Sequence, residues 1–408
     1  MSQDRQHVLV VGGGPAGMAA ALTAAQGGAQ VTLLERRPAP GKKLLATGNG
    51  RCNLANRGPL CYPGGGEFAG AVFKHCPVSR VLEALRGWGL TLYTDGDGRV
   101  YPAIMQATAV LSALTERLEE RRVRVLTGRD VSGIARAADG FDVTAADGGR
   151  YRADRLILAT GGLAGGALGS RRTDYALAEG LGHTVTALMP ALSALKTSAR
   201  SREGLSGLRL PALLTLKADG RAVMSALGEA LFTDDGVSGI CAMQLSREAG
   251  LRLARGERVA LSIDLSDLLF PGPRDYGLRP PQDRPDTKRA LAFIKKRAQT
   301  MDPSHVLTGI LPDRLAARWK DLPPLEQARR ITDLTLDVTG VRPMEQAQVT
   351  AGGVRVSEVD PARMASLRVK GLYLCGELLD VDGDCGGFNL QFAFASGMLA
   401  GTAAASKG

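Results

Sequence analysis

The chain has 408 residues, 44% hydrophobic and 23% charged, which is enough for two or three domains with large cores. Its apolar runs are shorter than the roughly 18 residues of a membrane-spanning helix, which argues against a membrane protein. Its six cysteines form neither a CxxC pair nor a cluster with histidine at zinc-binding spacing, which argues against a dithiol reductase and a metal site. The net charge of +10 favours an anionic partner, although an arginine-rich composition alone would give the same excess.

A βαβ unit is predicted at the N-terminus. Val8–Val11 is an apolar run typical of a buried parallel strand, and Met18–Ala25 is a small-residue stretch that predicts a helix. Gly12–Gly17 lies between them with the spacing G-x-G-x-x-G, and a second strand, Val31–Leu34, leads into Glu35. The first strand starts so early that no signal peptide fits before it, and we expect a cytoplasmic protein with reduced thiols.

The residue types of this unit suit a dinucleotide rather than a merely structural glycine turn. Gly12 permits the tight turn, Gly14 lets the backbone approach a pyrophosphate, and Gly17 lets the helix pack closely. The helix N-terminus favours phosphates. Glu35 can accept hydrogen bonds from a ribose, which indicates FAD or NAD rather than NADP. The predicted contacts are Gly12, Gly14, Pro15, Ala16, Gly17, Glu35 and Arg36.

The next segment, Gly41–Asn53, is too polar and too rich in glycine for a strand, and it is predicted as two loops around a short apolar patch. Lysine, threonine, asparagine and arginine beside glycines suit phosphate and flavin-ring contacts, whereas the alternative is a solvated loop. The predicted cofactor contacts here are Lys43, Thr47, Gly50, Arg51 and Asn53.

This segment, G-x-K-L-L followed by G-x-G-R-C-N, resembles the loop of BaiN/RdsA-type flavoproteins, the aminoacetone oxidase family. The resemblance extends over nearly the whole chain, for example at Gly98–Pro102, Gly228–Gly239 and Gln348–Val354. It implies that the cofactor is FAD. It also implies an α/β fold in which a three-layer, Rossmann-like FAD-binding domain with a parallel sheet is interrupted by an insert.

Further elements of the first domain follow in order. Helices are predicted at Val78–Trp88 and Ala107–Glu120, a strand at Val123–Leu126, and a hairpin over 141–153. Val131 falls where related FAD folds offer backbone amides to adenine. A strand is predicted to end at Thr160 and Gly161, and by resemblance to many FAD oxidoreductases this strand end packs near the cofactor. The run 169–174 then departs from the G-S-T-G-D-G pattern of the family, because two glycines are replaced and two arginines are present.

From Pro190 the pattern changes to short alternating strands with Gly, Ser and Asp between them, which predicts a β-barrel-like part. Helices are predicted later at Thr287–Gln299, Pro312–Trp319 and Leu325–Leu334. The insert carries 24 Lys and Arg against 18 Asp and Glu, so it holds most of the positive charge. It is a candidate surface for ribosomal RNA, although exposed basic helix faces are common and no aromatic RNA-binding motif is present.

The chain returns to the first domain near Met344. A strand ends at Gly376 and Glu377, an acidic and glycine-rich loop follows, and a small-residue helix is predicted at Phe392–Ala405. By resemblance to FAD folds, this segment approaches the ribityl chain, the pyrophosphate and the flavin ring. The predicted contacts are Gly376, Glu377, Asp384, Gly386, Gly387, Asn389, Leu390 and Gln391. The predicted domains are 1–186 and 344–408 for FAD, 187–275 for the barrel-like part and 276–343 for the helical part.

The catalytic candidates lie on the two loops expected to meet at the flavin. Cys52 or Cys385 could donate a proton to a substrate carbon, with ordinary packing of a thiol as the alternative, and Arg51 and Asn53 are candidates for contacts with flavin or substrate. The chain has a single dinucleotide motif, so NAD(P)H is expected only as a transient electron donor. The four histidines are predicted to be structural.

Two classes of function follow. The first is an FAD enzyme that reduces an electron-poor C=C bond. The family resemblance implies uridine reduction to dihydrouridine in large-subunit ribosomal RNA, or oxidation of an amine or reduction of an enone among small molecules. The second is a non-catalytic, RNA-binding flavoprotein. The sequence predicts no oligomeric state.

Overall fold

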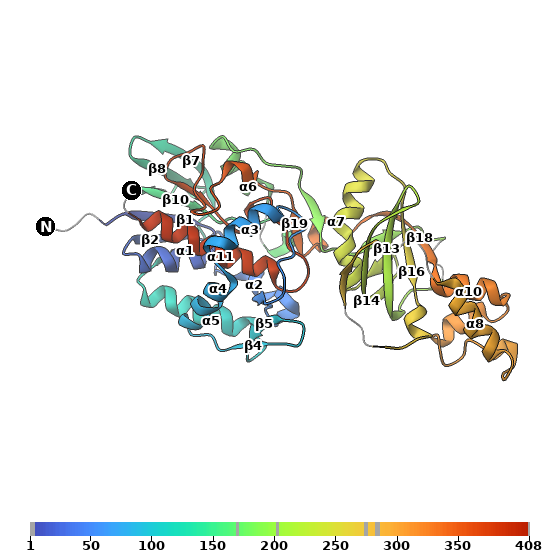
Figure 1. Cartoon of the computed structure of the whole chain (residues 1–408). Coiled ribbons are helices and arrows are strands. Elements are labelled where there is room, and N and C mark those ends of the chain that lie inside the picture. The colour runs from blue at the N-terminus through green and yellow to red at the C-terminus, as the bar shows by residue number, and fades with distance from the viewer. Residues whose placement is uncertain (1–4, 169–170, 201–203, 273–275, 282–285, 407–408) are drawn as a thin grey trace. The chain divides into compact units, whose positions relative to one another are not determined.

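The computed structural model describes residues 5–168, 171–200, 204–272, 276–281 and 286–406 (Figure 1). The chain forms two compact units, which we call the cofactor unit (residues 1–189 and 349–408) and the insert (190–348). It leaves the first unit within β11 (Met189–Ala191) and returns to it before β19 (Val349–Ala351). None of the described helices is both long enough and apolar enough to cross a membrane.

A five-stranded parallel sheet forms the centre of the cofactor unit, in the order β20-β10-β1-β2-β6. Val8, Leu9 and Val10 are fully buried in it, as expected of a strand covered on both faces. Its strands are β1 (His7–Val11), β2 (Gln30–Leu34), β6 (Arg124–Leu126), β10 (Arg155–Leu158) and β20 (Leu372–Leu374).

Helices α1 (Pro15–Gln26) and α11 (Phe388–Ala405) lie side by side on one face of this sheet (Figure 1). They approach closely because small residues line the contact. A Cβ on Gly397 would lie 2.3 Å from the carbonyl oxygen of Ala16. The three-stranded sheet of β7 (Val131–Ala137), β8 (Gly140–Ala145) and β9 (Arg150–Ala153) forms the third layer. The predicted three-layer, Rossmann-like domain is confirmed.

Two local predictions in the cofactor unit need correction. Lys42–Leu45 forms a short helix, α2, and Thr47–Gly50 forms a 3-10 turn, whereas loops were predicted there. Helix α11 begins at Phe388, one turn before the predicted start, because Phe388 packs into the core and continues its apolar face. The remaining helices are α3 (Gly66–His75), α4 (Val78–Gly87), α5 (Ala107–Glu120) and α6 (Arg172–Gly180), and the remaining strands are β3 (Ala55–Asn56), β4 (Leu92–Thr94) and β5 (Arg99–Pro102).

The insert contains a closed antiparallel barrel, which confirms the predicted barrel-like part. Its ring order is β13-β16-β18-β12-β15-β14, and pairing of β14 with β13 closes it. Leu214, Leu261 and Leu336 are fully buried in its core. The strands are β12 (Leu195–Thr197), β13 (Arg209–Ala218), β14 (Arg221–Thr233), β15 (Gly236–Ser238), β16 (Val259–Asp264) and β18 (Leu334–Val341), with β17 (Gly277–Arg279) pairing outside the ring.

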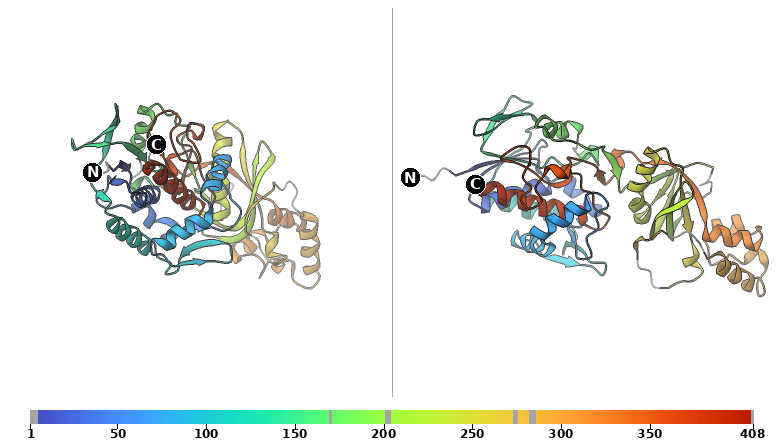
Figure 2. Two further views of the ribbon diagram at one scale, coloured as in Figure 1. Left: turned by 60° about the vertical axis from the view of Figure 1, so that its left-hand side comes forward. Right: turned by 45° about the horizontal axis from the view of Figure 1, so that its top comes forward.

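The helices of the insert differ in part from the sequence analysis. Helix α7 (Ile240–Ala254) was missed, because polar Gln244 and Ser246 occupy its buried face and obscure the apolar pattern. The segment predicted as helical also contains strands β17 and β18. Three predicted helices are present as α8 (Thr287–Arg297), α9 (Asp313–Trp319) and α10 (Pro324–Thr332). Figures 1 and 2 show α8 and α10 together beyond one end of the barrel.

Candidate functional site

The glycine turn after β1 has a shape that other residues could not adopt. Gly12 has φ +105°, and a Cβ there would lie 2.4 Å from the carbonyl oxygen of Ala159. A Cβ on Gly17 would lie only 1.9 Å from the carbonyl oxygen of Gly12, so the helix can pack this closely only without one. Nothing lies within 4 Å of the same position on Gly14. The turn therefore leaves open space at Gly14, just before α1, which begins at Pro15 and whose first backbone N–H is that of Ala16.

The carboxylate of Glu35 is fixed at the end of β2. Its Oε2 accepts a hydrogen bond from the backbone N–H of Gly13 at 2.8 Å, and its Oε1 accepts one from Arg37 at 2.7 Å. The backbone N–H of Arg129 donates to the carbonyl oxygen of Glu35 at 2.9 Å, which brings the start of β7 at Val131 into the same neighbourhood. Glu35 thus keeps acceptor capacity for a ribose in a rigid position.

The loop after α2 is built from left-handed residues. Gly48, Asn49 and Gly50 have φ values of 57°, 53° and 82°, and Cys52 has φ 60°. The hydroxyl of Thr47 donates to the carbonyl oxygen of Leu44 at 2.6 Å, so it closes the preceding helical turn. The backbone N–H groups of Arg51 and Cys52 donate within this loop, each at 3.1 Å, to the carbonyl oxygens of Gly48 and Thr47, so the loop is held by its own backbone.

Two segments more than 300 residues apart meet at Lys43 and Glu377. The ammonium nitrogen of Lys43 lies 2.6 Å from Oε2 of Glu377, and both side chains are mostly buried. Oε1 of Glu377 accepts the backbone N–H of Thr350 at 3.0 Å. Gly376, the residue before Glu377, has no room for a side chain, because a Cβ at this position would lie 2.7 Å from the Cβ of Ala16. The pair therefore ties α2 to the end of β20 beside the α1 turn.

The loop before α11 is held to the segment 53–62 by contacts that the sequence analysis missed. Asn56 donates from its backbone N–H to Oε1 of Gln391 at 2.7 Å and from Nδ2 to the carbonyl oxygen of Gly386 at 3.0 Å. The hydroxyl of Tyr62 donates to the carbonyl oxygen of Phe388 at 2.8 Å. Within the loop, Asn389 exchanges two hydrogen bonds of 2.8 Å with the backbone of Gly383. No local motif marks Asn56 or Tyr62, since their partners are distant in sequence.

Several residues predicted to contact the cofactor instead use their side chains in contacts within the protein. Gln391 and Asn389 belong to the first turn of α11 and use their side-chain oxygens within the protein, and Leu390 between them is half-buried. Asp384 accepts the N–H of Cys385 at 2.6 Å. Gly387, the residue just before α11, has φ +102°, and a Cβ there would lie 2.5 Å from Oδ1 of Asn53. The loop 47–53 and the N-terminus of α11 therefore lie next to each other.

Two buried oxygens fit an FAD molecule at this place. Oδ1 of Asn53 and the hydroxyl of Thr160, which follows β10 beside Gly161, have no hydrogen-bond partner in the described part of the chain. An unpartnered buried oxygen is costly unless a ligand or water completes it. Together with the open turn at Gly14 and the fixed carboxylate of Glu35, these atoms provide suitable partners for a dinucleotide.

The two candidate cysteines differ in access. Cys52 is 0% exposed within the apolar core, and burial raises the pKa of its thiol to about 11, against a weaker opposing hydrogen bond involving Thr47. Cys385 is half-buried, and Arg51 is exposed. All six cysteines lie among the described residues and none forms a disulfide. Cys52 can therefore reach a substrate only if its surroundings move, whereas Cys385 has exposed surface.

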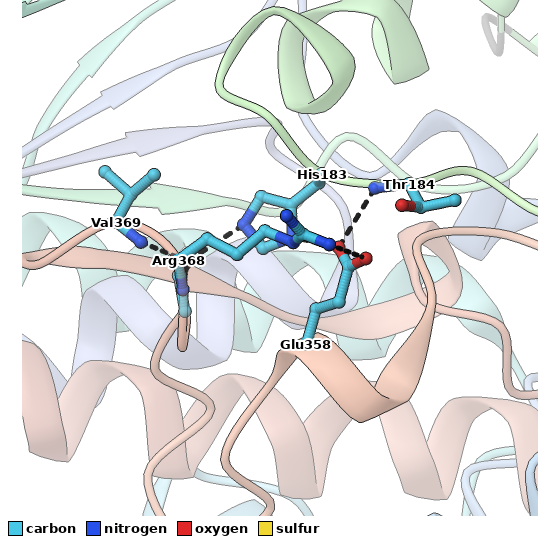
Figure 3. Close-up of polar contacts among 6 residues, drawn as sticks. His183, Thr184, Glu358, Arg368 and Val369 are labelled. Carbon is cyan, nitrogen blue, oxygen red and sulfur yellow. Dashed lines mark hydrogen bonds and ion pairs between the residues drawn. The ribbon is translucent and has the colours of Figure 1, made fainter.

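His183 lies in a buried network outside this site (Figure 3). Its Nδ1 lies 3.0 Å from Glu358 and its Nε2 lies 2.9 Å from the hydroxyl of Ser366, which has the connectivity of a serine–histidine–glutamate triad. The Ser366 oxygen, however, also accepts backbone N–H groups of Arg368 and Val369 at 3.1 and 2.8 Å. These donors stabilise the hydroxyl in a turn and leave it a poor nucleophile, so the arrangement is that of a structural histidine.

Burial and neighbouring groups set the protonation states of His183 and Glu358 in this network. Burial lowers the pKa of His183, although its contact with Glu358 opposes that effect. Burial also opposes ionisation of Glu358, yet hydrogen bonds from Arg368 at 2.7 Å and from the N–H of Thr184 at 2.9 Å lower its pKa to about 2. A neutral histidine and an ionised glutamate therefore hold the segment after α6 to residues 356–369. Within the described residues, no cluster of three His, Cys, Asp or Glu could bind a metal ion.

Comparison with known proteins gave matches over the whole chain. The HI0933-like protein Rossmann domain matches residues 6–403. A 3-dehydro-bile acid delta(4,6)-reductase of Clostridium scindens is 37% identical over 421 residues, covering 98% of this chain and 99% of the relative. A ribosomal RNA dihydrouridine synthase of Escherichia coli is 27% identical, covering 96% of each chain. Among solved structures, the open form of a flavocytochrome c3 fumarate reductase matches with a TM-score of 0.50 at 15% identity, over 99% of this chain and 78% of the other.

Proposed function

Because the chain belongs to the HI0933-like family and is an FAD-dependent oxidoreductase, we propose that it reduces a carbon–carbon double bond conjugated to a carbonyl group. The family membership confirms the resemblance found at residues 41–53. The proposal is carried by the site at Gly14, Glu35 and Asn53, which fits FAD, together with the names of two full-length relatives.

The two named relatives act on substrates that share one chemical feature. A 3-oxo steroid with double bonds at positions 4 and 6 and a uracil ring both contain a C=C bond in conjugation with a carbonyl group. Conjugation makes the far carbon electron-poor, so it accepts a hydride, while the near carbon then takes a proton. Reduced FAD, when bound, supplies the hydride. The protein must supply FAD binding, a fixed substrate, a proton and a water-poor environment.

The side chains suit these tasks as follows. Glu35 and the N-terminus of α1 would hold the ribose and the pyrophosphate, and the N-terminus of α11 would favour negative charge on the flavin ring. Asn53 and Arg51 would contact flavin or substrate. Of the two cysteines, Cys385 is the better proton donor, because it has exposed surface and Cys52 has none.

A uridine of ribosomal RNA is the first substrate to test, because positive charge gathers on the helical part of the insert. Residues 286–332 contain ten Lys and Arg against five Asp and Glu. Lys288, Lys295, Lys296 and Lys320 are exposed there, and no carboxylate in the described residues pairs with them. Such a surface would neutralise phosphates, and the uracil to be reduced would be extruded from the RNA.

A small-molecule enone is the second candidate substrate. It is favoured by the 37% identity to the bile acid reductase, which exceeds the 27% identity to the dihydrouridine synthase over a similar share of the chain. NADH or NADPH would serve as a transient electron donor, since the chain has one dinucleotide motif. A cytoplasmic location is part of the proposal, and it is supported by the six cysteines, none of which forms a disulfide in the described structure, as suits a reducing compartment.

The test follows the flavin through a full cycle. The FAD-loaded protein is reduced anaerobically with NADH or NADPH, and its reoxidation is timed with unmodified ribosomal RNA fragments, with a 4-en-3-one steroid and with oxygen. Fast reoxidation by RNA supports the first substrate, and fast reoxidation by the steroid supports the second. Reoxidation by oxygen alone contradicts C=C reduction, and RNA binding without reoxidation indicates a non-catalytic RNA-binding flavoprotein.

The cysteines are compared in the same experiment. Cys385→Ser should slow reoxidation by the substrate at least tenfold while leaving reduction of the flavin unchanged, because only the second half-reaction needs the proton. Cys52→Ser is the matched control, and we expect it to change thermal stability more than either rate. A greater loss of substrate reduction in the Cys52 variant would reverse this assignment.

A further inference from the structure

Four charged side chains form a continuous group at the N-terminus of α6, which we call the α6 charge cluster: Arg36, Asp130, Arg171 and Asp174. The guanidinium of Arg171 pairs with Asp130 and lies 3.9 Å from Oδ1 of Asp174. The guanidinium of Arg36 lies 3.9 Å from Oδ2 of Asp174. The backbone N–H of Arg171 also donates to Asp174 at 3.1 Å. The arginines and carboxylates therefore alternate across three segments of the cofactor unit.

The members come from the segments expected to hold adenosine. Arg36 follows Glu35, the predicted ribose ligand, and Asp130 precedes Val131, the predicted neighbour of adenine. These two segments already touch through the backbone, as the N–H of Arg129 donates to the carbonyl oxygen of Glu35 at 2.9 Å. Helix α6 is packed against β7, and its first turn joins the two segments a second time through the charges.

The cluster differs from a set of solvated surface charges. The side chain of Asp174 is 13% exposed, and burial raises its pKa although Arg36 and Arg171 oppose that effect. A carboxylate this buried is stable as an anion only with its cationic partners in place. Arg172, the next residue of the helix, instead pairs along α6 with Glu179 at 2.7 Å and has 55% of its side chain exposed. Arg171 itself keeps 41% of its side chain exposed, so the two neighbouring arginines differ chiefly in their partners: Arg171 bridges segments, whereas Arg172 pairs within its own helix.

We propose that the α6 charge cluster is a latch for the adenosine end of FAD: Arg171 joins the Glu35 and Val131 segments and so slows release of the cofactor. The proposal rests on the assignment of Glu35 and Val131 to adenosine. Arg171 is a positioning residue in this scheme, since it acts through Asp130 and Asp174. A cofactor that ends at the flavin phosphate would have no adenosine between these segments and would not use the latch.

The test measures release of FAD from the full chain by the rise in flavin fluorescence. Arg171→Gln should increase the FAD dissociation rate about threefold to tenfold, in the range expected for partly exposed, networked ion pairs. Affinity for FMN, which lacks adenosine, should not change. Arg172→Gln is the matched control and should leave both values unchanged. Asp130→Asn should have the effect of Arg171→Gln, and the double variant should be no worse than either single one.

Three outcomes separate the latch from its premise. If Glu35→Gln leaves FAD affinity unchanged, the assignment of this end to adenosine is wrong. If Glu35→Gln weakens FAD binding and Arg171→Gln does not, the latch is wrong while the assignment stands. Equal losses of FMN and FAD affinity in Arg171→Gln, with a lower unfolding temperature of the apoprotein, would show a general structural role and would also overturn the proposal.

Discussion

The cofactor unit and the helical part of the insert hold their polar groups in opposite ways. Around the predicted FAD site, carboxylates accept hydrogen bonds from backbone N–H groups, as at Glu35, and segments distant in sequence are joined, as at Lys43 and Glu377. On α8, Lys295 and Lys296 are exposed, with no carboxylate partner among the described residues. Contacts of the first kind depend on close packing of the backbone and side chains. Contacts of the second kind would depend on the total charge of the surface, which salt screens.

This difference predicts how each region responds to substitution. A change in the cofactor unit should act through backbone contacts and be large, whereas a change on the basic helices should act on a partner and leave the fold intact. The following predictions test that contrast, from the largest expected effect on stability to the smallest.

The largest effect is expected at the glycine turn. Gly17→Ala places a Cβ 1.9 Å from the carbonyl oxygen of Gly12, so helix and strand must separate, and we expect a loss of about 3 kcal/mol in the free energy of unfolding. Gly14→Ala is the matched control, because its Cβ would meet nothing within 4 Å and its φ of −77° suits alanine. Denaturant unfolding and FAD content per chain measure both effects.

The two variants should separate folding from cofactor binding. Gly14→Ala should unfold within about 0.5 kcal/mol of the parent chain yet bind FAD at least tenfold more weakly, because the added methyl occupies the approach of the pyrophosphate. Normal FAD affinity in this variant would contradict the placement of the pyrophosphate at the turn. Normal stability of Gly17→Ala would contradict the close packing itself.

How much of this could be predicted from the sequence depends on how the contacts are made. The glycine turn, the strands of the parallel sheet and the strands of the barrel were predictable, because each is marked by a local pattern of residue types with a narrow structural use. Asn56 and Tyr62 were not, since each contacts α11 or its preceding loop across more than 320 residues. The burial of Cys52 was also hidden, because a motif places a residue on a loop without telling which way its side chain points.

A smaller effect is expected at the buried histidine network. In the unfolded chain, His183 takes up a proton near its ordinary pKa of 6.5, whereas in the folded protein its pKa is lower. Because the unfolded chain therefore binds more protons, the free energy of unfolding falls as pH drops below about 6.5. Glu358 adds a further loss below its ordinary value of 4.5, as pH falls toward about 2. His183→Gln should cost about 1–3 kcal/mol at neutral pH through the loss of buried hydrogen bonds.

Urea unfolding between pH 7.5 and about pH 2.5 checks this prediction, because this range covers the decline expected from each of the two groups. The variant His183→Gln should lose much of the decline just below pH 6.5 and keep the decline at lower pH that Glu358 causes. Arg368→Gln offers a comparison, because it removes a donor to Glu358, whereas its charge is only a minor cause of the lowered pKa of His183, so it should affect mainly the lower range. An unchanged profile in His183→Gln would show that the pH dependence arises elsewhere.

The smallest effect on the fold is expected on α8. Replacing Lys295 and Lys296 by glutamate should change the free energy of unfolding by less than about 0.5 kcal/mol, since both side chains are exposed, and should leave FAD binding unchanged.

If these lysines bind phosphates, the variant should bind ribosomal RNA fragments more weakly. The slope of the logarithm of the binding constant against the logarithm of salt concentration should also become shallower, by about 0.9 for each phosphate that the variant no longer neutralises. Replacing Lys42 and Lys74 by glutamate, two exposed lysines of the cofactor unit, makes the same change in net charge and controls for net charge alone. Equal weakening in both cases would assign the effect to overall charge, and a preserved affinity and slope in the α8 variant would remove these helices as the RNA surface. The small-molecule substrate would then gain weight, because a steroid enone needs no such surface.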